Sequence, residues 1–340
     1  MKDPRKTRVR RSGVAALAVA AALVQGGMSA TAQADPAPAT PLPVPQNFII
    51  DAVLGALQGG GASPPGTNNW GCRPSAEHPE PVVLVHGLMA NRVDNWQTYG
   101  PLLANNGYCV FALTYGSADG DPNGNIGGLT SMQTSSKTLD AFVDRVRQAT
   151  GAPKVAIVGH SEGATMPYWY LKRDGGASKV SKMIGLSPAV HGIGGEELAN
   201  TGSSTGSADV PAPFQFSATS DFIRQLNEGG ITVPGVAYTQ IVTRYDEVIV
   251  PYTSGIVNEP GAVNHVVQDY CPQDYADHLS INSDPGAASL VLNALDPAHA
   301  EPVQCALVLP AIGVVGGSGS ASGSGGSGSA SGSAGTGSGG

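Results

Sequence analysis

The stretch "KVAIVGHSEGATMPYWYLK", residues 154–172, decides the fold class. An apolar run at 155–158 leads directly into "GHSEG", residues 159–163, and a helical pattern follows at once. A serine nucleophile at the edge of a sheet needs this strand-to-helix turn, with small flanking residues that let the two backbones approach closely. We therefore predict that Ser161 is a nucleophile held at the end of a strand.

The same Gly-x-Ser-x-Gly pattern occurs a second time, in "GSSTG" at 202–206 around Ser204. In a chain with 47 glycines the pattern alone is weak evidence. Ser204 has no apolar strand before it and no helical pattern after it. The context therefore favours Ser161 over Ser204.

Short apolar runs alternate with helical patterns along most of the chain. Strands are expected at 81–87, 109–113, 154–159, 179–187, 236–243 and 262–271, and helices at 95–108, 135–151, 164–172 and 286–295. This alternation predicts an α/β fold with a mostly parallel sheet covered by helices on both faces. Ligands on such sheets bind at the carboxyl ends of the strands. Residues 188–234 break the alternation, which predicts either a lid or a surface excursion.

A serine hydroxyl becomes a nucleophile when an imidazole takes its proton and a carboxylate orients that imidazole. In an α/β sheet with a serine elbow, the expected chain order is serine, acid, histidine. His278, in "DYADHLSI", lies in a loop between the last expected strand and the following helix. His191 opens the polar insertion, His265 lies inside an expected strand, and His299 comes late in the chain. We predict that His278 is the general base.

The acid is expected just beyond the fifth predicted strand, again at a carboxyl end. Asp246, in "VTRYDEVIVP", occupies this position, and Glu247 is its nearest rival. Asp274 and Asp277 share the loop of the histidine and fit less well. We predict Asp246 as the acid; the alternative is an exposed turn aspartate paired with Arg244.

The tetrahedral intermediate of acyl transfer needs backbone N–H donors aimed at its oxyanion. One donor is expected from the residue after the nucleophile, Glu162. The other is expected from the loop after the first strand, where "VHGLMAN" places Leu88 directly behind His86 and Gly87. We expect His86 to brace this loop rather than to act in catalysis.

The two ends of the chain differ from its middle. Residues 1–34 combine six basic residues, an apolar run at 14–24 and a small-residue ending, which predicts a signal peptide; an uncleaved anchor is the alternative. Residues 35–46 are rich in Pro and Ala and predict an extended linker. Residues 313–340 are nearly all Gly, Ser and Ala and are expected to be disordered. The catalytic domain is thus expected at 47–312.

Charge narrows the classes of partner. The chain has a formal net charge of −8, and the first 34 residues carry +5, so the chain without them has −13. Nucleic acids and anionic lipids are bound by clustered Lys and Arg, which makes both improbable partners. We expect a secreted protein that does not bind nucleic acid.

The four cysteines, Cys72, Cys109, Cys271 and Cys305, follow an export signal and therefore predict structural disulfides rather than a metal site. Three pairings are possible, and sequence order favours Cys72 with Cys109 and Cys271 with Cys305. The chemistry requires no cofactor and no metal. The loop acids Asp274, Asp277 and Asp284 are expected to be solvated rather than to hold a cation, because hard cations need six or more converging oxygens.

Four segments together resemble a known family: "VVLVHGLMANRVDNW", "VGHSEGATMPYWYLK", "TRYDEVIVP" and "CPQDYADHLSI". They are similar to the secreted class 2 lipases and esterases of actinobacteria, in the α/β-hydrolase superfamily. The resemblance covers roughly residues 70–305 and includes the cysteine positions. It implies hydrolysis of carboxylic esters of lipids. The implied triad is Ser161, Asp246 and His278, and the implied oxyanion donors are Leu88 and Glu162.

The chain departs from this family at two positions of the serine motif. Members more often carry Gln or Met after the serine and then a second Gly, whereas this chain has Glu162 and Ala164. The expected enzyme is a secreted monomer that contacts a lipid interface transiently. Two other hypotheses are kept: a cell-envelope acyltransferase with the same triad, and a non-catalytic binding module.

Overall fold

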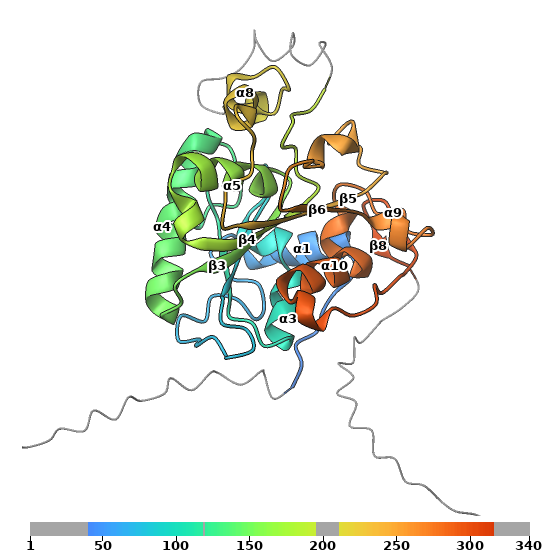
Figure 1. The fold of residues 1–340 in the computed structure, drawn as a ribbon. Coiled ribbons are helices and arrows are strands. Elements are labelled where there is room, and N and C mark those ends of the chain that lie inside the picture. The colour runs from blue at the N-terminus through green and yellow to red at the C-terminus, as the bar shows by residue number, and fades with distance from the viewer. Residues whose placement is uncertain (1–39, 118–119, 195–210, 316–340) are drawn as a thin grey trace, which may run out of the picture. The chain divides into compact units, whose positions relative to one another are not determined.

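The computed structural model describes residues 40–117, 120–194 and 211–315 (Figure 1). The predicted signal peptide, Ser204, the first residues of the predicted linker and most of the predicted tail lie outside these ranges. None of the helices described has the length and hydropathy of a membrane-spanning helix.

Strands and helices alternate over the described ranges. The strands are β1 (Val82–Val85), β2 (Val110–Leu113), β3 (Val155–His160), β4 (Val180–Leu186), β5 (Ala237–Val242), β6 (Ala262–Val266), β7 (Val308–Leu309) and β8 (Gly313–Val314). The α-helices are α1 (Phe48–Gln58), α2 (Arg92–Asn95), α3 (Tyr99–Asn105), α4 (Met132–Thr150), α5 (Glu162–Arg173), α7 (Ala212–Gln215), α8 (Asp221–Asn227), α9 (Val267–Tyr270) and α10 (Pro285–Leu295). Short 3-10 helices are η1 (Gly176–Ser178), η2 (Tyr252–Gly255), η3 (Ser280–Ser283) and η4 (Pro297–His299).

The first six strands form one parallel sheet in the order β2-β1-β3-β4-β5-β6, as the sequence predicts. The chain starts at β1, moves outward to β2 and returns to β3 on the other side of β1. This reversal between β1 and β3 is a topological switch point, where ligands bind at the carboxyl ends of the strands. Val85 pairs with Gly159 at that end, so the loops after β1 and β3 are neighbours.

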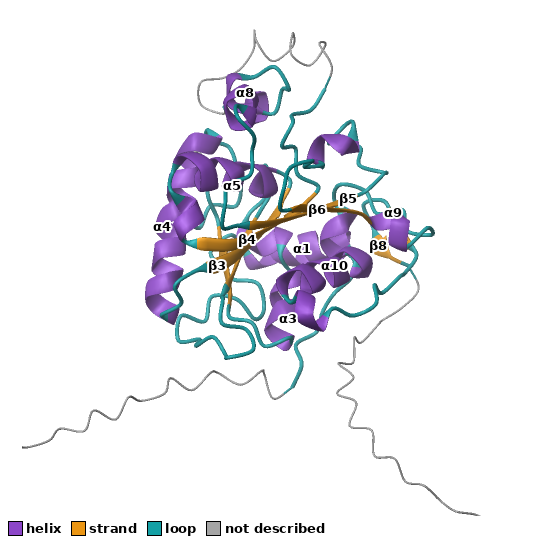
Figure 2. Cartoon of the chain, in the orientation of Figure 1, coloured by secondary structure: helices purple, strands orange, loops and turns teal. Residues whose placement is uncertain are grey.

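Helices cover both faces of the sheet (Figure 2), and each face has its own hydrophobic core. On one face, α4 and α5 pack against residues such as Val83, Phe111 and Ile157, and α8 packs on α5. On the other face, α3 and α10 pack against residues such as Leu84 and Val158. Strands β1, β2 and β3 are buried along their whole length, which explains their continuous apolar sequence.

Three predicted elements differ from the structure by more than two residues at one end or both. The helix expected at 95–108 is the shorter α3, which begins at Tyr99 and so places Pro101 within its first turn, where proline is tolerated. The strand expected at 262–271 ends at Val266, and α9 turns Gln268 back toward β5. Helix α4 begins before residue 135, with Ser131 as its cap.

Described residues on both sides of the range 47–312 make hydrogen bonds with the folded part of the chain. Leu42 exchanges two hydrogen bonds of 2.8 Å with the Asn105 side chain, so the described part of the predicted linker packs on the domain. At the other end, β8 pairs with β7, and Val314 N donates to Gln46 O at 2.8 Å. The ordered chain therefore includes residues on both sides of 47–312.

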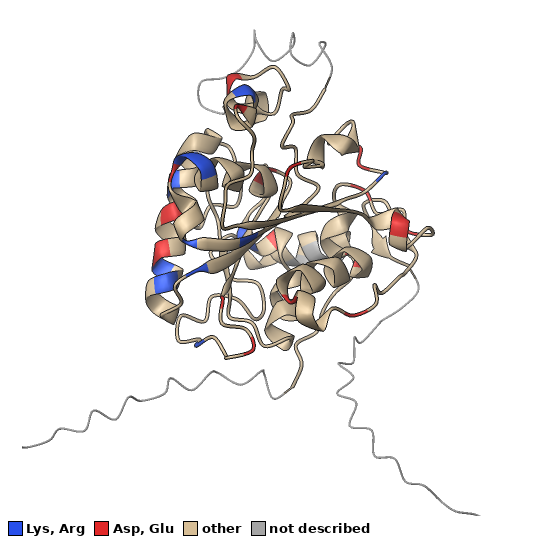
Figure 3. Cartoon of the chain, viewed as in Figure 1, with Lys and Arg blue, Asp and Glu red and all other residues tan. Residues whose placement is uncertain are grey.

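Charged side chains of the α4 side are paired with one another. Figure 3 shows Lys and Arg mainly on α4, at the end of α5 and at nearby strand ends. Lys179 Nζ lies 2.7 Å from Asp140 and 2.8 Å from Asp144, and Lys182 lies 3.0 Å from Glu80. This face therefore mixes both signs rather than presenting the basic stripe that nucleic acids need.

The turn around Ser161 depends on close backbone approach. Ser161 has φ 55° and ψ −116°, a strained conformation for a residue with a side chain. A Cβ at Gly163 would collide with the carbonyl oxygens of Val85 and His86, and a Cβ at Gly159 would collide with the Gly163 carbonyl. Both flanking glycines are therefore required by the packing of β1, β3 and α5.

Replacing Gly163 by Ala is expected to lower the free energy of unfolding by about 3 kcal/mol or more, because backbone atoms cannot move aside as a flexible side chain can. Gly61→Ala is the matched control, since its Cβ would meet no atom closer than 3.9 Å and should change stability by less than about 0.5 kcal/mol. Urea denaturation followed by circular dichroism measures both. Equal stability of the two variants would contradict this account of the turn.

Candidate active site

The structure brings the three residues of the predicted triad into one hydrogen-bonded chain. Ser161 Oγ lies 2.9 Å from His278 Nε2, and His278 Nδ1 lies 3.0 Å from Asp246 Oδ2. Ser161 follows β3 and Asp246 follows β5, both at carboxyl ends of the sheet. All three side chains are buried, with residue exposures of 4 to 8%. This arrangement can deprotonate the serine hydroxyl and stabilise the imidazolium that results.

Asp246 is held in place and in its charged form by its own turn. Its Oδ1 accepts hydrogen bonds from Val248 N at 3.1 Å and Ile249 N at 2.7 Å. Burial alone would raise the pKa of Asp246, but the bonds from His278 and the backbone outweigh burial and lower that pKa. Arg244 pairs with Asp269 instead, so the alternative of an Asp246–Arg244 pair is wrong.

The side chains of Glu247 and His160 hold the loop of His278. Glu247, the rival acid, accepts the His278 backbone N–H at 3.0 Å, so it fixes the loop rather than the imidazole. His160 Nε2 donates to the His278 carbonyl at 2.9 Å, while its Nδ1 accepts from Asn282 Nδ2 at 2.9 Å. Burial lowers the pKa of His160 to about 3, which keeps this histidine neutral. Its place beside Ser161 is the one sequence signal that could have suggested this role.

The loop after β1 is fixed on both sides of Leu88. Gly87 N donates to Asn95 Oδ1 at 2.8 Å, and Met89 N donates to Gly127 O at 3.0 Å. Within the described residues, the N–H groups of Leu88 and Glu162 donate no hydrogen bond. Glu162 is the first residue of α5, where helix N–H groups have no partner in the helix. Both predicted oxyanion donors are therefore free to bind an external acceptor.

His86 braces this loop, as the sequence predicts. Its Nδ1 donates to Gly87 O at 2.8 Å, its Nε2 accepts from Tyr115 N at 3.2 Å, and its ring stacks on that of Tyr115. Burial lowers the pKa of His86 to about 4, so the ring is neutral. Asn95 and Tyr115, which complete the brace, carry no motif that could have revealed them.

A cavity of about 280 Å³ lies beside Ser161 and His278. Its other walls include Leu88, Met89 and Leu279, and α1 contributes Phe48. The described part of the insertion at 188–234 contributes no wall to this cavity. Helix α8 instead packs on α5, where Lys172 Nζ donates to Leu226 O at 2.7 Å. The described part thus packs on the core beside α5 and lines no wall of this cavity, and residues 195–210 of the insertion lie outside the described ranges.

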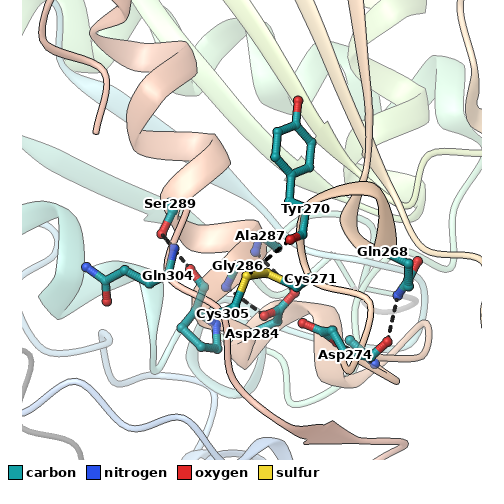
Figure 4. Close-up of a disulfide and its surroundings, with 12 residues drawn as sticks. Gln268, Tyr270, Cys271, Asp274, Asp284, Gly286, Ala287, Ser289, Gln304 and Cys305 are labelled. Atoms are coloured by element: carbon teal, nitrogen blue, oxygen red, sulfur yellow. Dashed lines mark hydrogen bonds between the residues drawn. A yellow bond between two sulfur atoms is a disulfide. The ribbon is translucent and has the colours of Figure 1, made fainter. Parts of the chain in front are cut away.

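A disulfide and buried acids organise the base of the His278 loop (Figure 4). Cys271 is bonded to Cys305, and Cys72 to Cys109, which is the pairing that sequence order favours.

The expectation of solvated loop acids is wrong, because Asp274, Asp277 and Asp284 are all buried. Asp284 caps α10 by accepting from Gly286 N at 2.7 Å and Ala287 N at 3.1 Å, and Asp274 lies beside it (Figure 4). Burial and the Asp274 charge raise the pKa of Asp284 well above its usual range. The described ranges contain no group of three or more His, Cys, Asp or Glu placed to hold a metal.

The comparison with family models decides the relationship. The model described as "Lipase (class 2)" matches residues 79–288, which include the whole hydrogen-bonded chain. The chain belongs to the class 2 lipase family. Two curated triacylglycerol lipases, from Pseudarthrobacter phenanthrenivorans and Burkholderia plantarii, are each 38% identical to it over 90 residues. That match covers 24% of this chain and 25% and 22% of theirs, so the chain spans about a quarter of these relatives.

A solved structure shows the fold of this class 2 lipase. Aspergillus fumigatus lipase B superimposes with a TM-score of 0.55 at 22% sequence identity. The match covers 71% of this chain and 57% of that chain. Together with the six-stranded parallel sheet, this similarity shows the α/β-hydrolase fold.

The buried neutral His86 should make this class 2 lipase lose stability in acid. The pKa of His86 is about 4 in the folded protein and 6.5 when exposed, so its full contribution to the free energy of unfolding is present above pH 6.5. Between pH 6.5 and 4, His86 binds a proton in the unfolded chain but not in the folded protein. This difference lowers the free energy of unfolding by up to about 3 kcal/mol.

The unfolding free energy of wild type minus that of His86→Gln should therefore fall by about 3 kcal/mol from pH 7.5 to 4. Urea denaturation at several pH values measures it. His299→Gln is the control, because the exposed His299 has its pKa raised by Asp296 and acts in the opposite direction. A difference between wild type and His86→Gln that does not change with pH would show that His86 takes up a proton as readily in the folded protein as in the unfolded chain.

Proposed function

We propose that the chain is a secreted carboxylic-ester hydrolase, a lipase or esterase, that works through an acyl-enzyme on Ser161. The observation that carries this proposal is the Ser161–His278–Asp246 chain, which opens into a cavity beside two free backbone N–H groups. Nucleophile, base, orienting acid and oxyanion donors are the groups that ester hydrolysis requires.

The reaction follows from this geometry. Ser161 Oγ attacks the ester carbonyl while His278 Nε2 takes its proton, and Asp246 stabilises the imidazolium. The N–H groups of Leu88 and Glu162 bind the oxyanion of the tetrahedral intermediate, which collapses as His278 passes the proton to the departing alcohol. Water then attacks the acyl-enzyme while His278 takes one of its protons. The second tetrahedral intermediate collapses as His278 returns that proton to Ser161 Oγ, which releases the acid.

Apolar side chains at the cavity support a lipid ester as the substrate. Met89 and Leu279 line the cavity and are exposed, and α1 carries Ile49, Val53 and Leu57 exposed at helical spacing. Such a surface binds the edge of an oil droplet or bilayer through buried apolar area. The acidic net charge fits neutral rather than anionic lipids. The curated relatives are triacylglycerol lipases, which agrees with this substrate class.

Secretion as a monomer with a cleaved leader completes the proposal. Two disulfides persist in oxidising compartments outside the cytoplasm, and the first 34 residues have the pattern of an export signal.

Replacing Ser161 by Ala should abolish hydrolysis of p-nitrophenyl esters, with kcat falling at least about a thousandfold while the circular dichroism spectrum is unchanged. Asp246→Asn should retain the fold and lower kcat by a similar factor, because the imidazole loses its orienting charge. Ser178→Ala, at an exposed serine of η1, is the control.

Equal activity of wild type and Ser161→Ala would sink the proposed nucleophile. Product analysis with a labelled ester in the presence of trehalose or glycerol distinguishes hydrolysis from the acyltransferase alternative. Hydrolysis should dominate; an excess of acylated acceptor over free acid would assign the same triad to transfer.

The double variant Val53→Ser with Leu57→Ser should bind emulsified triglyceride less well. We expect its activity on emulsions to fall severalfold while hydrolysis of a soluble short-chain ester stays close to wild type, because neither residue lines the cavity. Val263→Ser, an exposed apolar residue of β6, is the control. An equal loss of activity on both substrates, or no loss on either, would contradict a role of α1 at the lipid surface.

A further inference from the structure

The Glu162 side chain is buried between the serine turn and the loop of Leu88. The residue is 0% exposed. A Cβ on Gly128 would lie 3.0 Å from Leu88 Cα, 3.2 Å from Gly87 O and 3.2 Å from Glu162 Oε2, so these groups meet at one point. The carboxyl group therefore fills the space between α5, the loop after β1 and the loop at residues 127–128.

No positive charge lies against a carboxylate in this place, and the nearby Tyr115 hydroxyl offsets only part of the effect of burial on the pKa of Glu162. Within the described residues, neither carboxyl oxygen of Glu162 receives a hydrogen bond. Its polar neighbour is Tyr115, whose hydroxyl gives its one proton to the His86 carbonyl at 2.8 Å. The Tyr115 oxygen can therefore accept a hydrogen bond from the carboxyl group but has no proton left to donate. An unpaired buried carboxylate is costly enough that such groups take up a proton instead.

We propose that Glu162 is a neutral positioning residue: its protonated carboxyl group, directed at the Tyr115 hydroxyl, holds the Leu88 loop against the serine turn and keeps negative charge away from the oxyanion. This inference rests on the proposed function for its kinetic consequences, but not for the protonation of the side chain. Burial raises the pKa of Glu162 well above its usual range, in agreement with this state.

The surroundings explain why protonation matters. The titratable groups on the elements packed around Glu162 are Tyr115, after β2, His86, after β1, and His160, at the end of β3. Burial keeps both histidines neutral. A carboxylate would thus meet no positive charge, while the backbone N–H of the same residue faces the developing oxyanion. Loss of the proton at alkaline pH should raise the barrier by like-charge repulsion and loosen the loop that carries the Leu88 N–H.

A direct test measures the proton by infrared spectroscopy. The difference spectrum of wild type minus Glu162→Gln at pH 7 should contain the carbonyl stretch of a protonated carboxylic acid, which disappears as pH rises. The difference removes the signals of other buried acids such as Asp284. A carboxylate band in its place would overturn the inference, whether or not the protein hydrolyses esters.

Kinetics tests the positioning role. Glu162→Ala should lower kcat about tenfold or more with little change in KM, and Glu162→Gln should recover most of that loss because the amide keeps the volume and a donor. Wild-type kcat should fall at alkaline pH over the range in which the infrared band disappears, and Glu162→Gln should lack that fall.

Equal kcat and equal pH profiles for all three proteins would overturn the positioning role. Tyr115→Phe provides a second route if Glu162→Ala does not fold, because it removes the acceptor of the carboxyl proton. The infrared band should then disappear, and kcat should fall, at a lower pH than in wild type. An unchanged band and profile in Tyr115→Phe would exclude the proposed contact. A wild type without esterase activity would contradict the proposed function alone and leave the infrared result standing.

Discussion

The close approach of three backbones at Gly159 and Gly163 is the constraint on which the site depends. Because neither glycine leaves room for a Cβ, the start of α5 lies directly against the ends of β1 and β3. That contact brings the free N–H of Glu162 to the same side of the sheet as the loop that carries Leu88. It also forces Ser161 into its strained conformation, which points the hydroxyl at the loop of His278. The proposed nucleophile and the proposed oxyanion donors are thus placed by one packing contact rather than by separate contacts.

The sequence predicts the parts of the fold that are encoded locally. Each of the six sheet strands is a short apolar run, and Ser161, Asp246 and His278 could be selected because each follows a strand in the expected order. What could not be predicted is held by contacts between distant segments. The bond from His160 to the His278 carbonyl joins residues 118 apart in sequence, and no local pattern distinguishes it. The end of the strand expected at 262–271 was wrong for a related reason, since Gln268 takes its role from a contact with Arg244. The start of α3, in contrast, had a local signal in Pro101.

Acidic residues were the hardest to assign, because composition shows how many there are but not where they are buried. A strongly acidic chain suggests solvated acids, yet Asp274, Asp284 and Glu162 are buried. One local signal was available for Asp284: it precedes Pro285, and Asp before Pro is a frequent start of a helix. No comparable signal existed for Glu162, whose burial follows from the loop that closes over it.

The electrostatics of the site follow from this burial. His86 and His160 are kept neutral by desolvation, whereas Asp246 is kept ionised by donors in its own turn. The proposed acyl transfer would create an imidazolium on His278 and an oxyanion beside Leu88, and in a low-dielectric interior each is sensitive to nearby charge. Asp246 supplies the counter-charge for the first, and two backbone dipoles supply it for the second. A neutral Glu162 fits this arrangement, because a carboxylate there would lie next to the negative oxyanion rather than next to the positive imidazolium.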